Sequence, residues 1–293
     1  MKTRSPIENR LRFAKMEGLG NDYIYVEQFS GPLRSLPELA RRMSDRHFGI
    51  GSDGLVLIGD SDKADFSMRM FNSDGSESEM CGNAIRCVGK YVYDRGMTLK
   101  TALTIETLAG IRNLKLSLSG YRVSTVRVDM GKPVRDPGRI PVRDKGKDFI
   151  DREITVGGKK YRGTAVSMGN PHLVVPVKDV DALDLMTLGP LFENHELFPN
   201  RVNTEFMQLV SQREIRVRTW ERGVGETLAC GTGACASVVA CVLNKATGRE
   251  VSVRLPGGDL LIDWDKNGTV YMTGPATCVF DGEYMVPADI DLK

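Results

Sequence analysis

Apolar and polar residues alternate in short runs along most of the chain, as they do in half-buried β-strands. The clearest runs contain Phe66, Met68 and Met70 in one place and Ile215 and Val217 in another. Similar runs predict further strands at residues 55–58, 123–130, 172–177, 204–210, 260–263 and 269–273. The chain is therefore predicted to be built mainly from short strands.

Two segments have the three- and four-residue apolar spacing of a helix instead. Each begins directly after a Cys-Gly pair, at Cys81 and at Cys230, and each follows a predicted strand and a polar loop. Their apolar positions are Ile85, Val88 and Val92 in the first and Ala234, Val238 and Val242 in the second. We expect Gly96 and Gly248 to end these helices, because glycine accepts the left-handed conformation that closes a helix.

These two segments belong to an internal repeat with an offset of 149 residues (230 − 81 = 149). Without any gap, the same offset relates Gly20-Asn21 to Gly169-Asn170, Phe66 to Ile215, Glu77 to Glu226 and Cys81-Gly82 to Cys230-Gly231. Chance matches between short apolar segments rarely share one offset. The chain is therefore interpreted as a duplicated unit.

The length of 293 residues agrees with two domains of ordinary size. The repeat assigns residues 1–129 to a first domain and 130–274 to a second, and we expect residues 275–293 to return to the first. Because few helices are predicted, we expect an α/β (α+β) fold of two pseudo-symmetric domains. Each domain should be a strongly bent sheet around one main helix, with an active site in the cleft between the two.

The composition indicates a globular protein without a nucleic-acid or membrane partner. Hydrophobic residues make up 41% and charged residues 27%, and 40 basic against 38 acidic residues leave a net charge of +2 that is mixed along the chain. The N-terminal residues lack the apolar core of an export signal, and no apolar run reaches the ~20 residues that span a bilayer. A cytoplasmic protein is therefore expected.

Six cysteines are too few in a chain of this length for a disulfide scaffold. Cys81 and Cys230 are placed at helix starts, where unpaired N–H groups and the helix dipole favour a thiolate and lower the pKa of a thiol. The other four have no counterpart in the repeat and are expected to be small buried residues: Cys87, Cys235, Cys241 and Cys278.

Two equivalent cysteines in a pseudo-twofold protein fit the inversion of a stereocentre. One thiolate would remove a proton from a tetrahedral carbon while the opposite thiol supplies one to the other face. Sulfurs ~3–3.5 Å from one carbon would lie roughly 6–7 Å apart. A redox disulfide is the alternative, although no Cys-x-x-Cys motif occurs, and none of the three histidines has the spacing of a metal ligand. No metal is expected.

One motif resembles a nucleotide-binding fingerprint. Residues 49–54 satisfy G-x-G-x-x-G, which requires a strand before it and a helix after it. Here residues 36–46 look helical and the following LVLI looks like a strand, so the order is reversed. We therefore interpret the motif as a glycine-rich turn.

Polar residues fall in the predicted loops at strand ends and helix starts, where they could bind a small charged substrate. They are Asn21, Asn72, Asn83, Asn170, Asn203 and the pair Glu221-Arg222. Arg222 could bind a carboxylate with two hydrogen bonds, Glu221 could take an ammonium, and the helix starts could hold a second carboxylate. An amino acid with charges at both ends would satisfy all of these groups.

These segments resemble the diaminopimelate epimerase family over nearly the whole chain. The matching segments are GLGNDY (18–23), MFNSDGSESEMCGNAIRC (70–87), MGNPH (168–172), RVN (201–203) and ERGVGETLACGTGACA (221–236). The resemblance implies a cofactor-independent enzyme that interconverts LL- and meso-diaminopimelate in the synthesis of lysine and peptidoglycan precursors. It also implies two similar domains, each a barrel-like sheet around a central helix, and a homodimer.

Transferred residue by residue, the resemblance makes Cys81 the proton donor and Cys230 the acceptor for the LL substrate. His172 and Glu221 would lie beside the reacting amino group. The reacting carboxylate would be held by Gly82, Asn83, Gly231 and Thr232. The rest of the substrate would be bound by Asn21, Asn72, Asn170, Asn203, Glu221 and Arg222.

The chain departs from the family pattern at two positions. Some members have Gln in the substrate site where this chain has Gly54, and a Tyr that supports dimerisation appears here as Phe280. Other functions remain open from the residues alone. They are another two-cysteine amino-acid racemase or epimerase of the proline racemase type, a redox dithiol protein and a non-catalytic binding protein.

Overall fold

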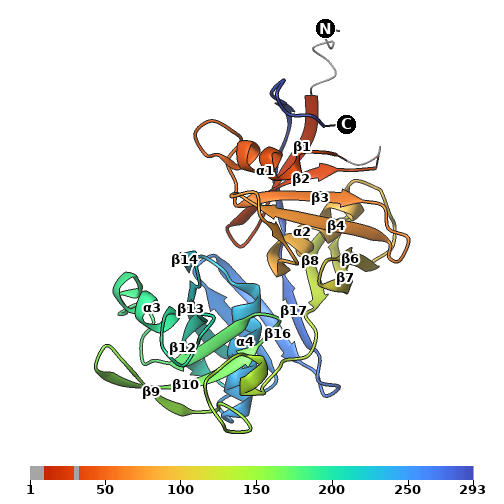
Figure 1. Cartoon of the computed structure of the whole chain (residues 1–293). Helices are drawn as coiled ribbons and strands as arrows, with labels where there is room; N and C mark the ends of the chain where they lie inside the picture. Colours follow the sequence, from red (N-terminus) through yellow and green to blue (C-terminus); the bar gives the residue numbers. More distant parts are fainter. Residues whose placement is uncertain (1–9, 30–32, 293) are drawn as a thin grey trace. The chain divides into compact units, whose positions relative to one another are not determined.

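The computed structural model describes residues 10–29 and 33–292 and forms two compact units (Figure 1). The N-terminal unit comprises Met1–Val128 together with Pro275–Lys293, and the C-terminal unit comprises Asp129–Gly274. The sequence interpretation had drawn the boundary one residue later, after residue 129. No helix among the described residues is long and apolar enough to cross a bilayer.

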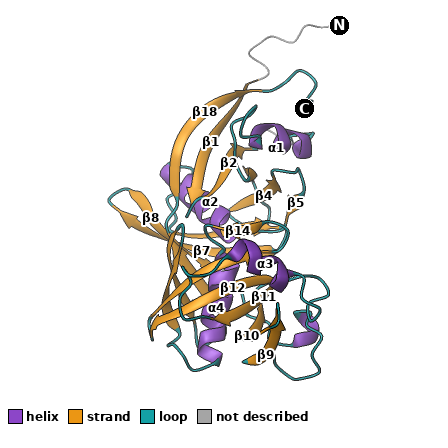
Figure 2. Ribbon diagram, turned by 90° about the vertical axis from the view of Figure 1, so that its left-hand side faces the viewer, coloured by secondary structure: helices purple, strands orange, loops and turns teal. Residues whose placement is uncertain are grey.

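The N-terminal unit is a mixed sheet with two helices. Its strands are β1 (Arg10–Gly18), β2 (Asn21–Glu27), β3 (Gly54–Gly59), β4 (Phe66–Asn72), β5 (Glu77–Ser78), β6 (Ala102–Thr107), β7 (Gly110–Ser119), β8 (Arg122–Asp129) and β18 (Thr277–Met285). The order is β18-β1-β2-β3-β4-β6-β7-β8, in which β2–β3 and β4–β6 are the parallel pairs. The helices are α1 (Leu36–Ser44) and α2 (Gly82–Asp94). In Figure 2, β18 and β1 run beside each other as long curved strands.

The C-terminal unit repeats this topology. Its strands are β9 (Arg152–Val156), β10 (Lys159–Ser167), β11 (Pro171–Pro176), β12 (Asn203–Ser211), β13 (Glu214–Glu221), β14 (Gly225–Thr227), β15 (Glu250–Leu255), β16 (Gly258–Trp264) and β17 (Val270–Gly274). The order is β9-β10-β11-β12-β13-β15-β16-β17, with β11–β12 and β13–β15 parallel. Its helices are α3 (Leu185–Glu193) and α4 (Gly231–Leu243), with a 3-10 turn at Pro137–Arg139.

The offset of 149 residues superposes whole elements. Adding 149 to the bounds of α1, α2 and β1 gives 185–193, 231–243 and 159–167, which are the bounds of α3, α4 and β10. The parallel pair β2–β3 likewise corresponds to β11–β12. The predicted pseudo-symmetric, strand-rich class is therefore confirmed.

Helix α4 is the centre of the C-terminal unit. From Ala234 to Cys241 every residue except Ser237 is apolar, and ten of its thirteen residues are buried. A helix that is apolar all round must be enclosed, and α4 packs against β10–β13 and β15–β17 (Figure 1).

Helix α2 has the same place in its own unit, packing against β1, β2 and β7. Gly89 faces Leu114 and Leu116 of β7 so closely that a Cβ would lie 2.9 Å from Leu114. The two cysteine loops are therefore each anchored on a buried helix.

The structure corrects three expectations. Helix α4 ends at Leu243 and not near Gly248, because Lys245 has a φ of 59° and closes the helix itself. Helix α3 was not predicted, since Gly189 and Pro190 inside it look like helix breakers. Cys278 is exposed on β18 and is not a buried residue. Helix α2 ends as expected, with Gly96 at a φ of 71°.

Candidate active site

Cys81 is the N-cap of α2 in the N-terminal unit. It is partly exposed, and its thiol donates a hydrogen bond to Asn21 Oδ1 at a sulfur–oxygen distance of 3.4 Å. Asn21 begins β2, and its Nδ2 donates to Asp53 Oδ2 at 2.7 Å. The side-chain amide of Asn21 is thus held between the thiol and a carboxylate.

Asp53 was not among the predicted site residues. Burial and the nearby Asp22 carboxylate raise its pKa, although Arg46 lies 3.0 Å from Asp53 Oδ1. Asp22 itself has a lowered pKa, because its hydrogen bonds with Arg46 and Lys15 outweigh the effect of burial. This network of charged side chains holds the Asp53 carboxylate that accepts the hydrogen bond from Asn21.

Asn72 and Gly54 face each other in the β3–β4 ladder. The Asn72 side chain donates to Ser76 Oγ at 3.0 Å, which orients its amide. A Cβ at Gly54 would overlap the Phe71 carbonyl oxygen and lie 2.8 Å from Tyr23 Cε1. This backbone therefore has no room for the side chain that some family members carry at the position of Gly54.

The first turn of α2 rests on a buried guanidinium. Arg86 has no exposed surface, and its Nη1 donates to Gly82 O at 3.2 Å and to Asn83 Oδ1 at 2.9 Å. Its Nε donates to Pro275 O at 3.0 Å, which ties the returning C-terminal segment to the helix. Arg86 therefore holds the side chain of Asn83 in place, a role that sequence reasoning missed.

Cys230 is the N-cap of α4 in the C-terminal unit and is 5% exposed. Its sulfur accepts a hydrogen bond from Gly233 N at 3.4 Å and lies 3.5 Å from Thr232 Oγ1. Thr232 Oγ1 also accepts from Asn170 Nδ2 at 3.3 Å. Asn170 is thereby linked to the first turn of α4.

His172 is fully buried between two oxygen atoms. Its Nδ1 lies 2.8 Å from Glu205 Oε1 and its Nε2 lies 2.9 Å from Asn170 Oδ1. Glu205, on β12, was not predicted from the sequence. The sequence feature that could have identified it is its position two residues after Asn203, because residues i and i+2 of a strand lie on the same face.

The β12–β13 hairpin brings Asn203 next to the Glu221-Arg222 pair. Asn203 Oδ1 accepts a hydrogen bond from Arg222 N at 2.9 Å, and Glu221 Oε1 accepts one from Thr227 Oγ1 at 2.6 Å. One Arg222 guanidinium nitrogen donates to Asn200 O at 3.1 Å. Asn203 is the first residue of β12 and Glu221 is the last residue of β13, so the hairpin closes on these two residues.

The electrostatic environment of Cys230 differs from the expectation. Burial, and then the carboxylates of Glu221 and Glu205, raise the pKa of the Cys230 thiol well above its usual value, although hydrogen bonds from Thr232 and Gly233 act in the opposite direction. Burial also raises the pKa of Glu221. The expected lowering by the helix start is therefore wrong for Cys230, which is a thiol at neutral pH.

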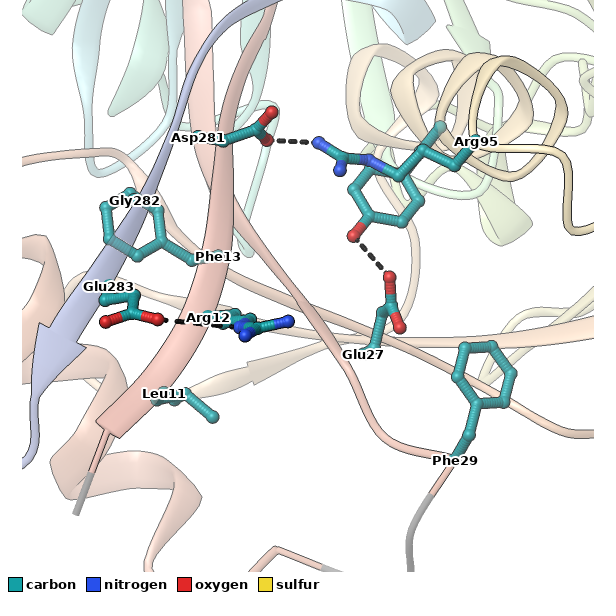
Figure 3. A pocket seen from close by; sticks show the side chains of 10 residues that line it. Leu11, Arg12, Phe13, Glu27, Phe29, Arg95, Asp281, Gly282 and Glu283 are labelled. Carbon is teal, nitrogen blue, oxygen red and sulfur yellow. Dashed lines mark hydrogen bonds and ion pairs between the residues drawn. The ribbon is translucent and has the colours of Figure 1, made fainter. Parts of the chain in front are cut away.

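The predicted residues thus form one cluster in each unit. The cluster around Cys81 contains Asn21, Gly82 and Asn83, and Asn72 lies in the same unit, opposite Gly54. The cluster around Cys230 contains Asn170, His172, Asn203, Glu221, Arg222, Gly231 and Thr232. A pocket of about 600 Å³ in the N-terminal unit belongs to neither cluster. It is lined by residues of β1, β2, β18 and the end of α2, including Arg12, Glu27, Arg95 and Asp281 (Figure 3).

Solved structures share this two-unit fold at low sequence identity. A PhzF-family phenazine biosynthesis protein from Bacillus anthracis aligns with a TM-score of 0.69 and 17% identity, covering 94% of this chain and 99% of that one. A hydroxyproline epimerase from Agrobacterium vitis aligns with a TM-score of 0.67 and 14% identity, covering 94% and 91%. The fold is therefore that of the PhzF and proline racemase-like proteins.

Sequence comparison defines the class and the family. The diaminopimelate epimerase family model matches residues 13–135 and 164–279. Proteins named diaminopimelate epimerase from Acetivibrio thermocellus and Desulfovibrio desulfuricans are each 56% identical, covering 93% and 94% of this chain and 98% and 99% of theirs. The chain is an enzyme of the isomerase class. It belongs to the diaminopimelate epimerase family.

Proposed function

We propose that this enzyme interconverts LL- and meso-diaminopimelate with Cys81 and Cys230 as its two acid–base groups. The observation that carries the proposal is that both cysteines are N-caps of equivalent thirteen-residue helices. For the LL substrate, Cys230 takes the α-proton and Cys81 supplies one to the opposite face, and the roles are exchanged in reverse. The alternative of a proline racemase type has weaker support, because the relatives at 56% identity carry the diaminopimelate epimerase name.

The helix starts suit the carboxylate of the reacting centre. The first N–H groups of a helix have no partner within the helix, so those near Gly82-Asn83 and Gly231-Thr232 can donate to an anion. Negative charge grows on this carboxylate as the α-proton leaves. N–H donors directed at that charge stabilise the transition state more than the bound substrate, and this difference lowers the activation barrier.

The raised pKa of Cys230 sets a condition for its role as a base. In the absence of substrate, burial with Glu221 and Glu205 keeps the thiol protonated. The substrate's α-ammonium would offset the charge of Glu221 and favour the thiolate. In the reverse direction the resting thiol is already in the form that donates a proton.

The non-reacting end of the substrate would be bound by polar residues of the two clusters. Arg222 can hold the distal carboxylate, since a guanidinium has donors beyond the one that binds Asn200 O. The amides of Asn21, Asn72, Asn170 and Asn203 would bind the distal ammonium and carboxylate. We propose that no cofactor takes part and that the enzyme works in the cytoplasm.

We also propose a homodimer formed through β18. This strand exposes three large apolar side chains, namely Val279, Phe280 and Met285, whose exposed fractions are 56%, 46% and 56%. Exposed large apolar side chains on an edge strand are typical of a surface that another chain covers.

Incubation with LL-diaminopimelate in D₂O tests the function directly. We expect deuterium at the α-carbon and formation of the meso isomer without any added cofactor. Proline serves as the comparison substrate and should show no exchange. Exchange into proline but not into diaminopimelate would overturn the assignment in favour of the alternative.

A further inference from the structure

Glu205 is a carboxylate with no exposed surface that the mechanism above does not use as an acid or base. Its Oε1 lies 2.8 Å from His172 Nδ1, and its Oε2 has no hydrogen-bond partner among the described residues. A carboxylate this deeply buried requires a compensating partner. Among the described residues, His172 is the only side chain that forms a hydrogen bond or ion pair with the Glu205 carboxylate.

The strands and α4 fix where Glu205 lies. In the β11–β12 ladder His172 is opposite Asn203, so Glu205 lies two residues further along the same face of β12. On its other side the carboxylate touches the first turn of α4, where a Cβ added to Gly233 would lie 2.5 Å from Glu205 Oε1. The carboxylate is therefore wedged between His172 and the helix that begins at Cys230.

Four contacts connect Glu205 to the thiol. They run from Glu205 Oε1 to His172 Nδ1 (2.8 Å), from His172 Nε2 to Asn170 Oδ1 (2.9 Å), from Asn170 Nδ2 to Thr232 Oγ1 (3.3 Å) and from Thr232 Oγ1 to Cys230 Sγ (3.5 Å). All belong to the C-terminal unit. The series is continuous from the buried carboxylate to the sulfur.

The direction of each hydrogen bond follows from the donors available. Asn170 uses its Nδ2 on Thr232, so its Oδ1 faces His172. Both ring nitrogens of His172 then face oxygen acceptors, and only an imidazolium donates from both. Because Thr232 Oγ1 accepts from Asn170, its own hydrogen is available to the Cys230 sulfur.

We propose that Glu205 is a positioning residue that holds His172 as an imidazolium, and thereby orients Asn170 so that the Thr232 hydroxyl donates to the Cys230 sulfur. Together with Gly233 N–H, the sulfur then has two donors ready for its thiolate form. This inference rests on the proposed function only for its consequence in turnover. The state of His172 is a property of the enzyme without substrate.

Nitrogen NMR of the substrate-free enzyme tests the charge of His172. The chain has three histidines, and His195 provides an internal comparison because its Nδ1 accepts from Leu197 N and its Nε2 faces Thr155 O. We expect ¹⁵N signals of two protonated nitrogens for His172 at pH 7.5 and of one for His195, with assignments from His47→Gln and His195→Gln. A bare ring nitrogen on His172 overturns the proposal, whatever the enzyme's activity.

The Glu205→Gln variant tests the consequence for turnover. It keeps the size of the side chain but removes the charge that stabilises the imidazolium, so we expect kcat to fall on the order of 10- to 100-fold with little change in KM. The ratio of variant to wild-type kcat, measured beside the two KM values, gives the size of this effect.

Thr219→Val is the matched control. Thr219 lies opposite Glu205 in the β12–β13 ladder, is equally buried, and its hydroxyl has no hydrogen-bond partner among the described residues. We expect its kcat ratio to the wild type to stay near one. A Glu205→Gln ratio that also stays near one overturns the proposal. An inactive wild type with an imidazolium at His172 would refute the proposed function and leave the positioning of His172 standing.

Discussion

Cys81 and Cys230 occupy the same N-cap position on equivalent helices, yet the charges around the two first turns are opposite. The turn after Cys81 rests on the buried Arg86 guanidinium, whereas Cys230 lies beside the buried carboxylate of Glu205 and the half-buried carboxylate of Glu221. The same offset that relates the cysteines relates Arg86 to Cys235 (86 + 149 = 235). The duplication therefore preserved the helix starts while the charged groups beneath them diverged.

Replacement of either cysteine should abolish epimerisation. Cys81→Ala and Cys230→Ala each remove one of the two acid–base groups, and loss of such a group costs roughly 10²- to 10⁴-fold in rate. Conversion of LL- to meso-diaminopimelate measures the loss. Cys241→Ala, in the same helix as Cys230 but without a predicted role, is the control and should retain turnover. Substantial epimerisation by either single variant would refute the two-base mechanism.

The two thiols should differ in their reaction with iodoacetamide. The pKa of Cys230 is raised well above its usual value of 9.0, so its thiolate appears only at high pH, and the residue is buried. Cys81 is partly exposed. Peptide mapping at pH 7.5 should therefore find Cys81 alkylated first, with Cys230 gaining on it as the pH rises. Equal labelling of the two at pH 7.5 would contradict the assigned environment of Cys230.

Glu193 should control the turn that presents Arg222. Its carboxylate, at the end of α3, accepts hydrogen bonds from Trp220 Nε1 at 2.7 Å, Gly223 N at 2.8 Å and Arg201 at 2.9 Å. Glu193→Ala leaves the buried Trp220 Nε1–H without a partner, which should lower the free energy of unfolding by about 1–3 kcal/mol. KM should rise as the turn loosens.

Urea denaturation and steady-state kinetics measure these two effects. Glu153→Gln is the control, because the ion pair of Glu153 with Lys160 is exposed and its loss should change stability by less than about 1 kcal/mol. A Glu193→Ala variant as stable as this control, with an unchanged KM, would show that the turn does not depend on Glu193.

Gly54 should tolerate no side chain. An added Cβ would overlap the Phe71 carbonyl oxygen and press on the Tyr23 ring. Gly54→Ala should therefore cost about 1–3 kcal/mol, the usual cost of overpacking, and Gly54→Gln should not improve substrate binding. Thermal unfolding and KM test this. A lowered KM in Gly54→Gln would show that the backbone adjusts and that the missing side chain can be restored.

The sequence predicted those features that repeat locally. The period-2 and helical spacings located β3, β4, β11, β12 and both cysteine helices, and the single offset related the two halves. Helix α3 was not predicted because its Gly189 is required by contact with the Trp220 ring, which comes from a distant strand. The roles of Arg86, Asp53 and Glu205 were missed for a similar reason. Each acts on a predicted residue through a charged side chain, buried in Arg86 and Glu205 and partly exposed in Asp53, that the fold brings to its partner.

For Cys230, the local sequence predicts a pKa shift in the wrong direction. A helix start favours a thiolate within one turn, and this was the basis of the expected lowering. Burial and two carboxylates brought in by β12 and β13 reverse it. Whether the predicted residues bind substrate together remains a prediction that the variants above test.

Phe280→Asp should convert the proposed dimer into monomers. Phe280 lies on the exposed β18 and packs edge-on against Phe13 with ring centroids 5.8 Å apart, so its ring is placed by its own chain and still presents 46% of its surface. A carboxylate in the covered interface would be desolvated without a partner, which costs several kcal/mol.

Light scattering after size-exclusion chromatography should give about 65 kDa for the wild type, twice the chain mass of 32.4 kDa, and the single-chain mass for the variant. Tyr121→Asp, at a 97% exposed residue away from β18, is the control and should stay dimeric. A wild type that elutes as a monomer at micromolar concentration would refute the proposed interface.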